Sequence, residues 1–319
     1  MTRHLTISIA ICTYNGEKFL PEQLDSFLAQ TRLPDEVVVC DDGSTDTTGE
    51  ILENFEKAAP FPVRIVHNEQ RLTYRNNFKK AMSLCQGELI SFSDQDDVWM
   101  SEKLEEVEQI FRQYPSVGHV FNDGLVVDAN GNSLGFSLWD VYGFSFRDTR
   151  YFPPGNLFSL KQFPAGATIT ANSRLIKDLW PFPELASQEW LGFAGRLVMP
   201  FVALPKKLNK YRQHERQLYG ATFFYKDKYK QARMVGNTCF ADNARIYKAF
   251  LQDFMSNPHI TIEQDTMKQF IDRIEHLEIR GNIKGPIFKR IPFIFKEILK
   301  GRYHRHSSGW RSVARDLLI

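Results

Sequence analysis

Cysteine is scarce in this chain, and long apolar runs are missing. Its 319 residues include four cysteines, none in CxxC spacing, and three of them lie in or beside apolar runs. We therefore expect reduced core thiols and no disulfide framework. No apolar stretch reaches the ~20 residues that span a bilayer. The start, MTRHLTISIAICTYNG, lacks a small-residue cleavage site and is expected to form a first strand, which predicts a cytoplasmic protein.

The chain carries little net charge, but that charge is unevenly distributed. The formal charge of the whole chain is +2. The tail from Lys284 onward has nine basic and two acidic residues, a net charge of +7, and the rest of the chain has a net charge of −5. This separation of a basic C-terminal end from an acidic remainder bears on which partners the chain binds. The apolar share of 43% and charged share of 24% are those of a globular protein and exclude a disordered chain.

Short β-rich runs alternate with helical periodicity in the first half of the chain. Strands are expected at 6–12, 36–40, 63–66, 89–92 and 117–121, and helices at 17–30, 45–57, 75–85 and 101–114. This pattern predicts a Rossmann-like α/β domain over residues 1–220, whose mostly parallel central sheet has helices on both faces. A turn is expected at 128–131 and a long aromatic loop at 138–163. Residues 221–319 are predicted to be helical, with breaks at Pro258, near Pro286 and at Pro292.

Polar clusters follow the first, second and fourth predicted strands. They are TYNG at 13–16, DDGSTD at 41–46 and DQDD at 94–97. Because ligands of open parallel sheets bind beyond the carboxyl ends of the strands, the clusters are expected at one edge. Any one of them could instead be a turn or a helix cap, and capping is favoured for 44–46. Three carboxylates within four residues repel one another unless a cation or several donors lie among them, so 94–97 is a candidate diphosphate–metal site for Mg²⁺ or Mn²⁺.

Three blocks of the chain resemble the inverting family 2 glycosyltransferases. They are TISIAICTYNGEKFLPEQLDSFLAQT, EVVVCDDGSTDTT and GELISFSDQDDVWMSEKL, and the DQDDVW form is similar to a bacterial rhamnosyltransferase-like subgroup. KYRQH near residue 212 and YHRHSSGWRSVARDLL extend the resemblance, more weakly, over nearly the whole chain. The resemblance implies a GT-A fold with a C-terminal helical segment, and metal-dependent transfer of a hexosyl or rhamnosyl group from a UDP- or dTDP-linked sugar.

The resemblance also implies donor-site roles by position. The donor-binding set is Thr13, Tyr14, Asn15, Glu17, Asp41, Asp42, Arg75, Asp94, Arg212 and His214. Asp42 would accept from the pyrimidine base, with Asp41 supporting its loop, and Asp96 would bind the metal, with Asp94 on the ribose or a metal-bound water. Arg212 and His214 would contact the diphosphate, although a single histidine can equally be structural. Arg75 is placed near the nucleotide although the usual glycine-rich loop reads QRLTYRNN here.

Glu189, in QEWL, occupies the place of the family's general base at a helix start. The chain departs from the subgroup here, with Glu where Asp is common and Gln188 where His is common. The alternative is a helix-start charge that interacts favourably with the helix dipole. On the acceptor side, the resemblance implies contacts from Gly166, Ala167 and Trp190, with Gly166 allowing close backbone approach.

The expected acceptor is a glycan or lipid-linked oligosaccharide, and no nucleic acid is expected because the basic charge is terminal and interleaved with Phe and Ile. In the tail, Ile294, Phe295, Ile298 and Leu299 are expected on one helix side, which predicts peripheral contact with the inner face of the membrane. Packing on the catalytic domain or in a homodimer is the alternative. Two other functions stay open: a nucleotidyltransferase, disfavoured by the single Gly and Lys of TYNGEKF, and a non-catalytic nucleotide- or lipid-binding module.

Overall fold

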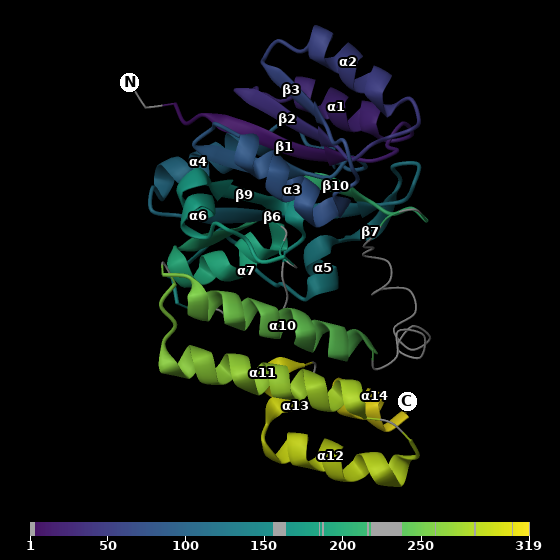
Figure 1. Ribbon diagram of the computed structural model, residues 1–319, viewed down its shortest axis with the longest axis vertical. Helices are drawn as coiled ribbons and strands as arrows, with labels where there is room; N and C mark the ends of the chain where they lie inside the picture. The colour runs from purple at the N-terminus through teal and green to yellow at the C-terminus, as the bar shows by residue number, and fades with distance from the viewer. Residues whose placement is uncertain are drawn as a thin grey trace. The chain divides into compact units, whose positions relative to one another are not determined.

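The protein is described by a computed structural model over residues 4–155, 164–184, 186, 188–215, 217, 238–258, 260–283, 285–307 and 309–318. These residues divide into two compact units, an α/β unit up to residue 217 and a helical unit from residue 238 (Figure 1). The predicted domain boundary at residue 220 lies outside the described residues.

The α/β unit alternates strands and helices as its sequence predicts. Its first half contains β1 (Ile7–Thr13), α1 (Leu20–Leu28), β2 (Glu36–Asp41), α2 (Thr48–Ala58), β3 (Val63–His67), α3 (Thr73–Leu84) and β4 (Leu89–Ser93). Its second half contains β5 (Val98–Trp99), α4 (Lys103–Gln113), β6 (His119–Val127), β7 (Ser133–Ser137), α5 (Leu138–Tyr142), β8 (Arg150–Phe152), a 3₁₀ turn η1 (Gly166–Thr168), β9 (Ile169–Asn172), α6 (Ser173–Asp178), α7 (Gln188–Val198) and β10 (Phe201–Arg212).

One sheet runs through this unit in the order β3-β2-β1-β4-β9-β6-β10-β5, with β7 beside β6 and β8 beside β10. The strands β3, β2, β1 and β4 are parallel to their neighbours, as predicted. Beyond β4 the sheet is mixed, because β9 pairs antiparallel with both β4 and β6. The registers place Thr13 beside Asp41 and Ile11 beside Ser93, so the carboxyl ends of β1, β2 and β4 meet at one edge.

Helices cover both faces of the parallel strands, which confirms the predicted layering. Alternate β1 residues from Ile7 to Ile11 pack with Phe27 of α1 and Leu52 of α2 in the main core. On the other face, Phe78 of α3 packs edge-on against Phe92 of β4, with ring centroids 6.5 Å apart. In Figure 1, α2 lies above the ribbons of β1–β3 and α3 lies below them. Two-sided burial explains the near-continuous apolar composition of these strands.

The segment predicted as an aromatic loop over 138–163 contains regular structure in its described part. Ser137 begins α5 with a capping box, accepting from the Asp140 amide while Asp140 accepts from the Ser137 amide. After α5, β8 adds to the sheet antiparallel to β10. Trp139 and Phe152 are joined through Phe146, at centroid distances of 5.6 Å to each. Aromatic packing therefore fixes a segment whose composition alone indicated a loop.

The helical unit contains α10 (Thr238–Ser256), α11 (Gln264–Asn282), α12 (Ile287–Leu299), α13 (Arg302–His306) and α14 (Trp310–Leu318). The predicted breaks at Pro258 and near Pro286 are confirmed, since α10 ends before the first and α12 begins after the second. The predicted break at Pro292 is wrong, because α12 continues through this proline. Among the described residues, every helix is too short or too polar to cross a lipid bilayer.

Candidate functional site

Side-chain hydrogen bonds cross-link the loops that follow β1 and β2. Asp41 accepts from the Thr13 hydroxyl (2.8 Å) and from the Ser44 amide (3.0 Å). Asn15 donates its amide to the Ser44 hydroxyl (2.9 Å) and accepts from the Thr45 amide (2.8 Å). Asp41 is buried, so its carboxylate supports the loop and faces away from solvent.

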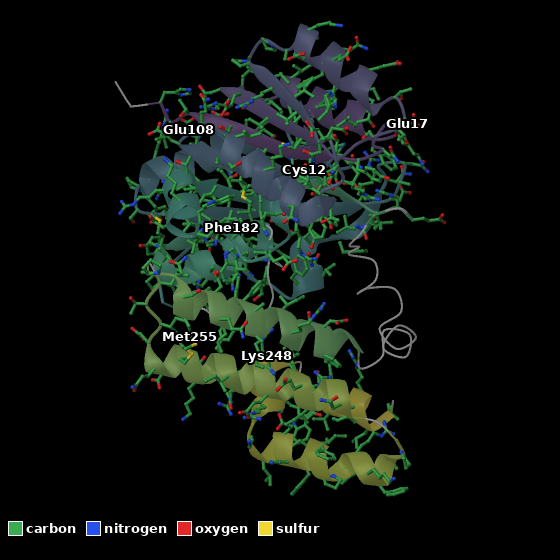
Figure 2. The ribbon with its side chains drawn as sticks, viewed as in Figure 1. Cys12, Glu17, Glu108, Phe182, Lys248 and Met255 are labelled. Carbon is green, nitrogen blue, oxygen red and sulfur yellow. The ribbon has the colours of Figure 1, made fainter. Side chains whose placement is uncertain are left out.

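Glu17 and Asp46 join the same two loops at the start of α2. The Glu17 amide donates to Asp46 (3.2 Å), and the Glu17 carboxylate accepts from the Thr47 hydroxyl (2.9 Å). Asp46 also accepts from the amide of Thr48 (3.0 Å), the first residue of α2, and thus binds the helix start from the position before the N-cap residue Thr47. Figure 2 labels Glu17 at this edge of the α/β unit and Glu108 of α4 at the opposite edge.

The acidic loop after β4 is tied to the β1 loop through Gln95. The Gln95 side chain accepts from the Tyr14 amide (2.9 Å) and donates to the Tyr14 carbonyl (3.1 Å). A Cβ at Gly16 would lie 2.5 Å from Gln95 Oε1, so a larger residue at this position would have to displace the Gln95 side chain. The three predicted polar clusters therefore form one continuous rim.

Asp42 anchors the segment that leads into α3. Its carboxylate accepts from the Asn68 side-chain amide (3.0 Å) and from the backbone amides of Leu72 (2.6 Å) and Thr73 (2.9 Å). These amides belong to the first residues of α3, whose dipole favours a negative charge at this position. A carboxylate accepts about four hydrogen bonds, so acceptor capacity remains on Oδ2 for the predicted contact with a base.

Arg71, which was not singled out from the sequence, borders the β1 loop. The Arg71 guanidinium lies 3.8 Å from the centroid of the Tyr14 ring, and its Nε lies 3.9 Å from Asp42. Arg75 lies on α3, with its guanidinium 4.8 Å from the centroid of the Tyr74 ring. Among the basic residues of QRLTYRNN, the described contacts therefore favour Arg71 as the one beside the expected nucleotide position.

Burial sets the electrostatics of the acidic loop. Asp97 is fully buried, and this burial, together with the nearby charges of Asp96 and Asp94, raises its pKa well above the usual range. Its carboxylate accepts from the Arg212 amide (3.1 Å). Lys103, the first residue of α4, is also fully buried, which lowers its pKa to about 7 against the opposing effects of Asp97 and Asp94. A buried cation thus partly balances a loop with three carboxylates.

The end of β10 brings His214 and Arg212 to the same loop. His214 Nε2 lies 2.8 Å from Asp96 Oδ2. The Arg212 side chain is buried and donates to the Asp96 carbonyl (2.9 Å), to the Ala129 carbonyl (3.1 Å) and to Glu22. These contacts let Arg212 position Asp96, and its predicted contact with a diphosphate stays a prediction.

Asp96 and His214 offer a small set of metal ligands. The described residues contain no group of three or more His, Cys, Asp or Glu side chains arranged around a metal ion. Mg²⁺ and related cations are commonly held by one or two protein ligands, with substrate phosphates and water completing the coordination. An oxygen of Asp96 and a nitrogen of His214 at the rim of a ligand crevice fit a cation of that kind.

A buried floor lies beside the acidic loop at η1. The Ala167 carbonyl accepts from the Lys103 ammonium (3.0 Å) and from the Asn209 side-chain amide (3.1 Å). A Cβ at Gly166 would lie 2.0 Å from Cγ of Gln188, so η1 and the first turn of α7 are in close contact. Gly166 and Ala167 are both buried, so the described contacts give them a structural role beneath the expected acceptor position.

Glu189 is the second residue of α7, and its side chain lies outside the described atoms. The neighbouring Trp190 is fully buried and packs against Phe193, with ring centroids 6.4 Å apart. This indole lies in the core, and its predicted acceptor contact stays a prediction. The contact between Gln188 and η1 places the backbone of Glu189 at the floor of the site.

Sequence comparison relates the α/β unit that contains this rim to known proteins. Residues 8–160 match the model of the family described as glycosyl transferase family 2. This match covers slightly less than half of the chain, from β1 to just beyond β8. The dTDP-rhamnosyl transferase RfbG of Shigella flexneri is 26% identical over 267 residues, which cover 77% of this chain and 86% of RfbG. An uncharacterized glycosyltransferase of Nostoc sp. is 29% identical over 41% of this chain.

Comparison with solved structures shows the same fold in another protein. The Staphylococcus aureus protein TarS (residues 1–349), crystallised with UDP-GlcNAc, superposes with a TM-score of 0.64 and 19% identity, covering 91% of this chain and 79% of that one. The predicted GT-A fold is thereby confirmed. The match spans only 40% of the Nostoc relative's length.

Gly166→Ala is expected to lower the rate of the reaction at this site roughly 10–100-fold. The added methyl group would overlap the Gln188 side chain at the start of α7, which must shift, and a displacement of about 1 Å at a site can reduce a rate by about 100-fold. The measurement is steady-state transfer together with the thermal unfolding midpoint. Gly49→Ala is the matched control, because its Cβ would meet nothing within 4 Å. Equal kcat values for the two variants would contradict a link between the floor and the reacting groups.

Proposed function

We propose that this chain is an inverting glycosyltransferase that uses a nucleoside-diphosphate sugar. The observation that carries the proposal is the rim formed by the β1, β2 and β4 loops, joined through Asp41 and Gln95 and completed by the 2.8 Å approach of His214 to Asp96. The site lies beyond the carboxyl ends of parallel strands, where ligands of such sheets bind. Its glycine-poor first loop does not suit a nucleotidyltransferase, which must hold a triphosphate.

The donor is proposed to be a UDP- or dTDP-linked sugar. RfbG is named a dTDP-rhamnosyl transferase, and TarS was crystallised with UDP-GlcNAc, so relatives of this chain handle both pyrimidine nucleotides. Asp42 and the exposed ring of Tyr14, with Arg71 stacked on it, are the groups proposed to contact the base. Asp94 is proposed to face the ribose.

The reaction is proposed to be a single displacement. Glu189 accepts the proton of an acceptor hydroxyl while that oxygen forms a bond to the anomeric carbon from the face opposite the diphosphate. The bond between the anomeric carbon and the diphosphate oxygen breaks, and the configuration inverts. Asp96 and His214 would hold Mg²⁺ or Mn²⁺, which would supply positive charge against the leaving diphosphate.

The acceptor is proposed to be a lipid-linked glycan of a bacterial surface polysaccharide. RfbG and TarS support a glycan acceptor only through their relationship to this chain, and the lipid carrier is inferred from the basic, apolar C-terminal tail. Such an acceptor would place the enzyme at the cytoplasmic face of the membrane as a peripheral protein.

A panel of nucleotide sugars tests the proposed function. Thermal stabilisation and donor hydrolysis are measured for UDP-, dTDP-, GDP- and CMP-sugars, each with and without Mn²⁺. We expect stabilisation by one pyrimidine diphosphate sugar, with slow hydrolysis that requires Mn²⁺. Stabilisation without turnover on any acceptor fraction would indicate a non-catalytic binding module. Release of pyrophosphate from a nucleoside triphosphate would instead indicate a nucleotidyltransferase.

A further inference from the structure

Helix α12 differs from an ordinary surface helix, because it buries two charged side chains, Arg290 and Glu297, and exposes most of its apolar ones. Glu297 is fully buried, where it lies 2.7 Å from His276 Nδ1 and accepts from the Arg302 guanidinium (3.2 Å). Arg290 is also buried and donates to the Asp316 carbonyl (3.3 Å). Ile294 is the one apolar residue of α12 in the buried set, and it packs in the small core of the helical unit.

The opposite side of α12 is apolar and exposed. The exposed fractions are 48% for Ile287, 48% for Ile291, 58% for Phe295 and 72% for Leu299, and these residues are four positions apart in sequence. This spacing places them in one row along the helix. Phe288, 67% exposed, extends the row on one side. We call these five residues the α12 stripe. The prediction that Ile294 lies on this side is wrong, because the stripe is rotated away from it.

Lysines border the α12 stripe. Lys289, Lys296 and Lys300 are exposed and are separated by seven and four positions, so they line one flank of the same helix. Apolar side chains beside a row of lysines match the interface of an anionic bilayer, in which the apolar residues enter the acyl boundary and the ammonium groups meet phosphates. A second copy of the chain would bring the same lysines together, so charge complementarity favours the membrane over a homodimer through this face.

We propose that α12 docks the protein on an anionic membrane surface, with the α12 stripe in the headgroup–acyl boundary. The buried polar contacts of α12 explain how its apolar stripe stays exposed. Because Glu297 and Arg290 hold the helix to α13 and α14 by buried polar contacts, the stripe is presented outward without loss of the helix's own packing. Figure 1 shows α12 on the side of the helical unit opposite α10. The inference rests on the proposed function only in that a lipid-linked acceptor would lie at the same surface.

Vesicle sedimentation of the full chain tests this proposal. The probes are phosphatidylcholine vesicles with and without phosphatidylglycerol, at low and high salt. We expect binding to the anionic vesicles that weakens with salt. Phe288→Gln/Phe295→Gln should lower the partition coefficient at least about tenfold by removing apolar contact. Lys289→Gln/Lys296→Gln/Lys300→Gln should lower it about 100-fold at low salt.

Met255→Gln/Ile271→Gln is the matched control, because it removes exposed apolar side chains from α10 and α11. Equal losses in this control and in the phenylalanine variant would overturn the proposal. So would unchanged binding in both α12 variants, or a dimer seen by light scattering that the phenylalanine variant alone dissociates. Donor hydrolysis in detergent-free solution should be equal in all variants, so loss of docking and failure of the proposed transfer activity are separable.

Discussion

Asp96→Ala is expected to lower kcat/KM for sugar transfer at least about 10³-fold, since a metal ion contributes several kcal/mol of charge stabilisation to the transition state. The fold should be retained, because the side chain of Asp96 is partly exposed and its carbonyl, which Arg212 contacts, is unchanged. Chelation of the wild-type enzyme should have the same effect. Activity is measured over a range of Mn²⁺ concentrations, and Mn²⁺ binding is followed independently by electron paramagnetic resonance.

Two further variants sharpen this test. His214→Ala should raise the Mn²⁺ concentration needed for half-maximal activity and weaken Mn²⁺ binding, if Nε2 shares the cation with Asp96. Asp25→Ala, an exposed carboxylate on α1, is the control and should leave both quantities unchanged. Full activity of the wild type in excess chelator would remove the metal from the mechanism, and His214 would then be a hydrogen-bond partner of Asp96 alone.

The parallel half of the fold was predictable because its signals are local. Apolar strands of five to seven residues, each followed by a helix with one apolar face, leave few alternative arrangements. Because parallel strands end at the same edge, the clusters at 13–16, 41–46 and 94–97 could be placed together before their contacts were known. The hydrogen bonds of Gln95 and Asn15 show how closely that edge is joined.

The antiparallel half was less predictable because its elements are short and depend on tertiary contacts. The four residues of β9 fit between β4 and β6 only after both strands are in place. The continuation of α12 through Pro292 has a similar cause. Proline removes one helical hydrogen bond, but the buried contacts of Arg290 and Glu297 on either side fix the helix.

Within the candidate site, sequence reasoning found the rim and missed its buried supports. The burial of Lys103 could have been predicted, because this residue lies four positions before Val107 on the apolar face of α4. A lysine that is buried in such a position must find hydrogen-bond partners. The burial of Trp190 could not be predicted, because α7 is apolar on most sides and its composition does not separate a core indole from a site residue. Arg71 lies four positions before Arg75, and its stack on Tyr14 depends on tertiary structure that the local sequence does not indicate.

Glu189→Gln is expected to lower kcat by roughly 10²–10⁴-fold, the usual contribution of a general base, while donor affinity stays nearly unchanged. The amide keeps the size of the side chain and removes its ability to accept a proton. The contact of Gln188 with Gly166 places residue 189 at the floor where the acceptor hydroxyl is expected. Single-turnover transfer gives the rate, and isothermal titration of the nucleotide gives the affinity.

Glu189→Asp separates reach from basicity in the same experiment. Aspartate is common at this position in the subgroup that the chain resembles, but its side chain is one methylene shorter than that of glutamate. We therefore expect the Glu189→Asp variant to transfer sugar more slowly than the wild type and faster than the Glu189→Gln variant. Glu184→Gln makes the same chemical change at an exposed position five residues earlier and should leave kcat unchanged. If Glu189→Gln retains kcat within a few-fold of Glu184→Gln, the base lies elsewhere, and residue 189 is a helix-start charge whose loss affects only the stability of α7.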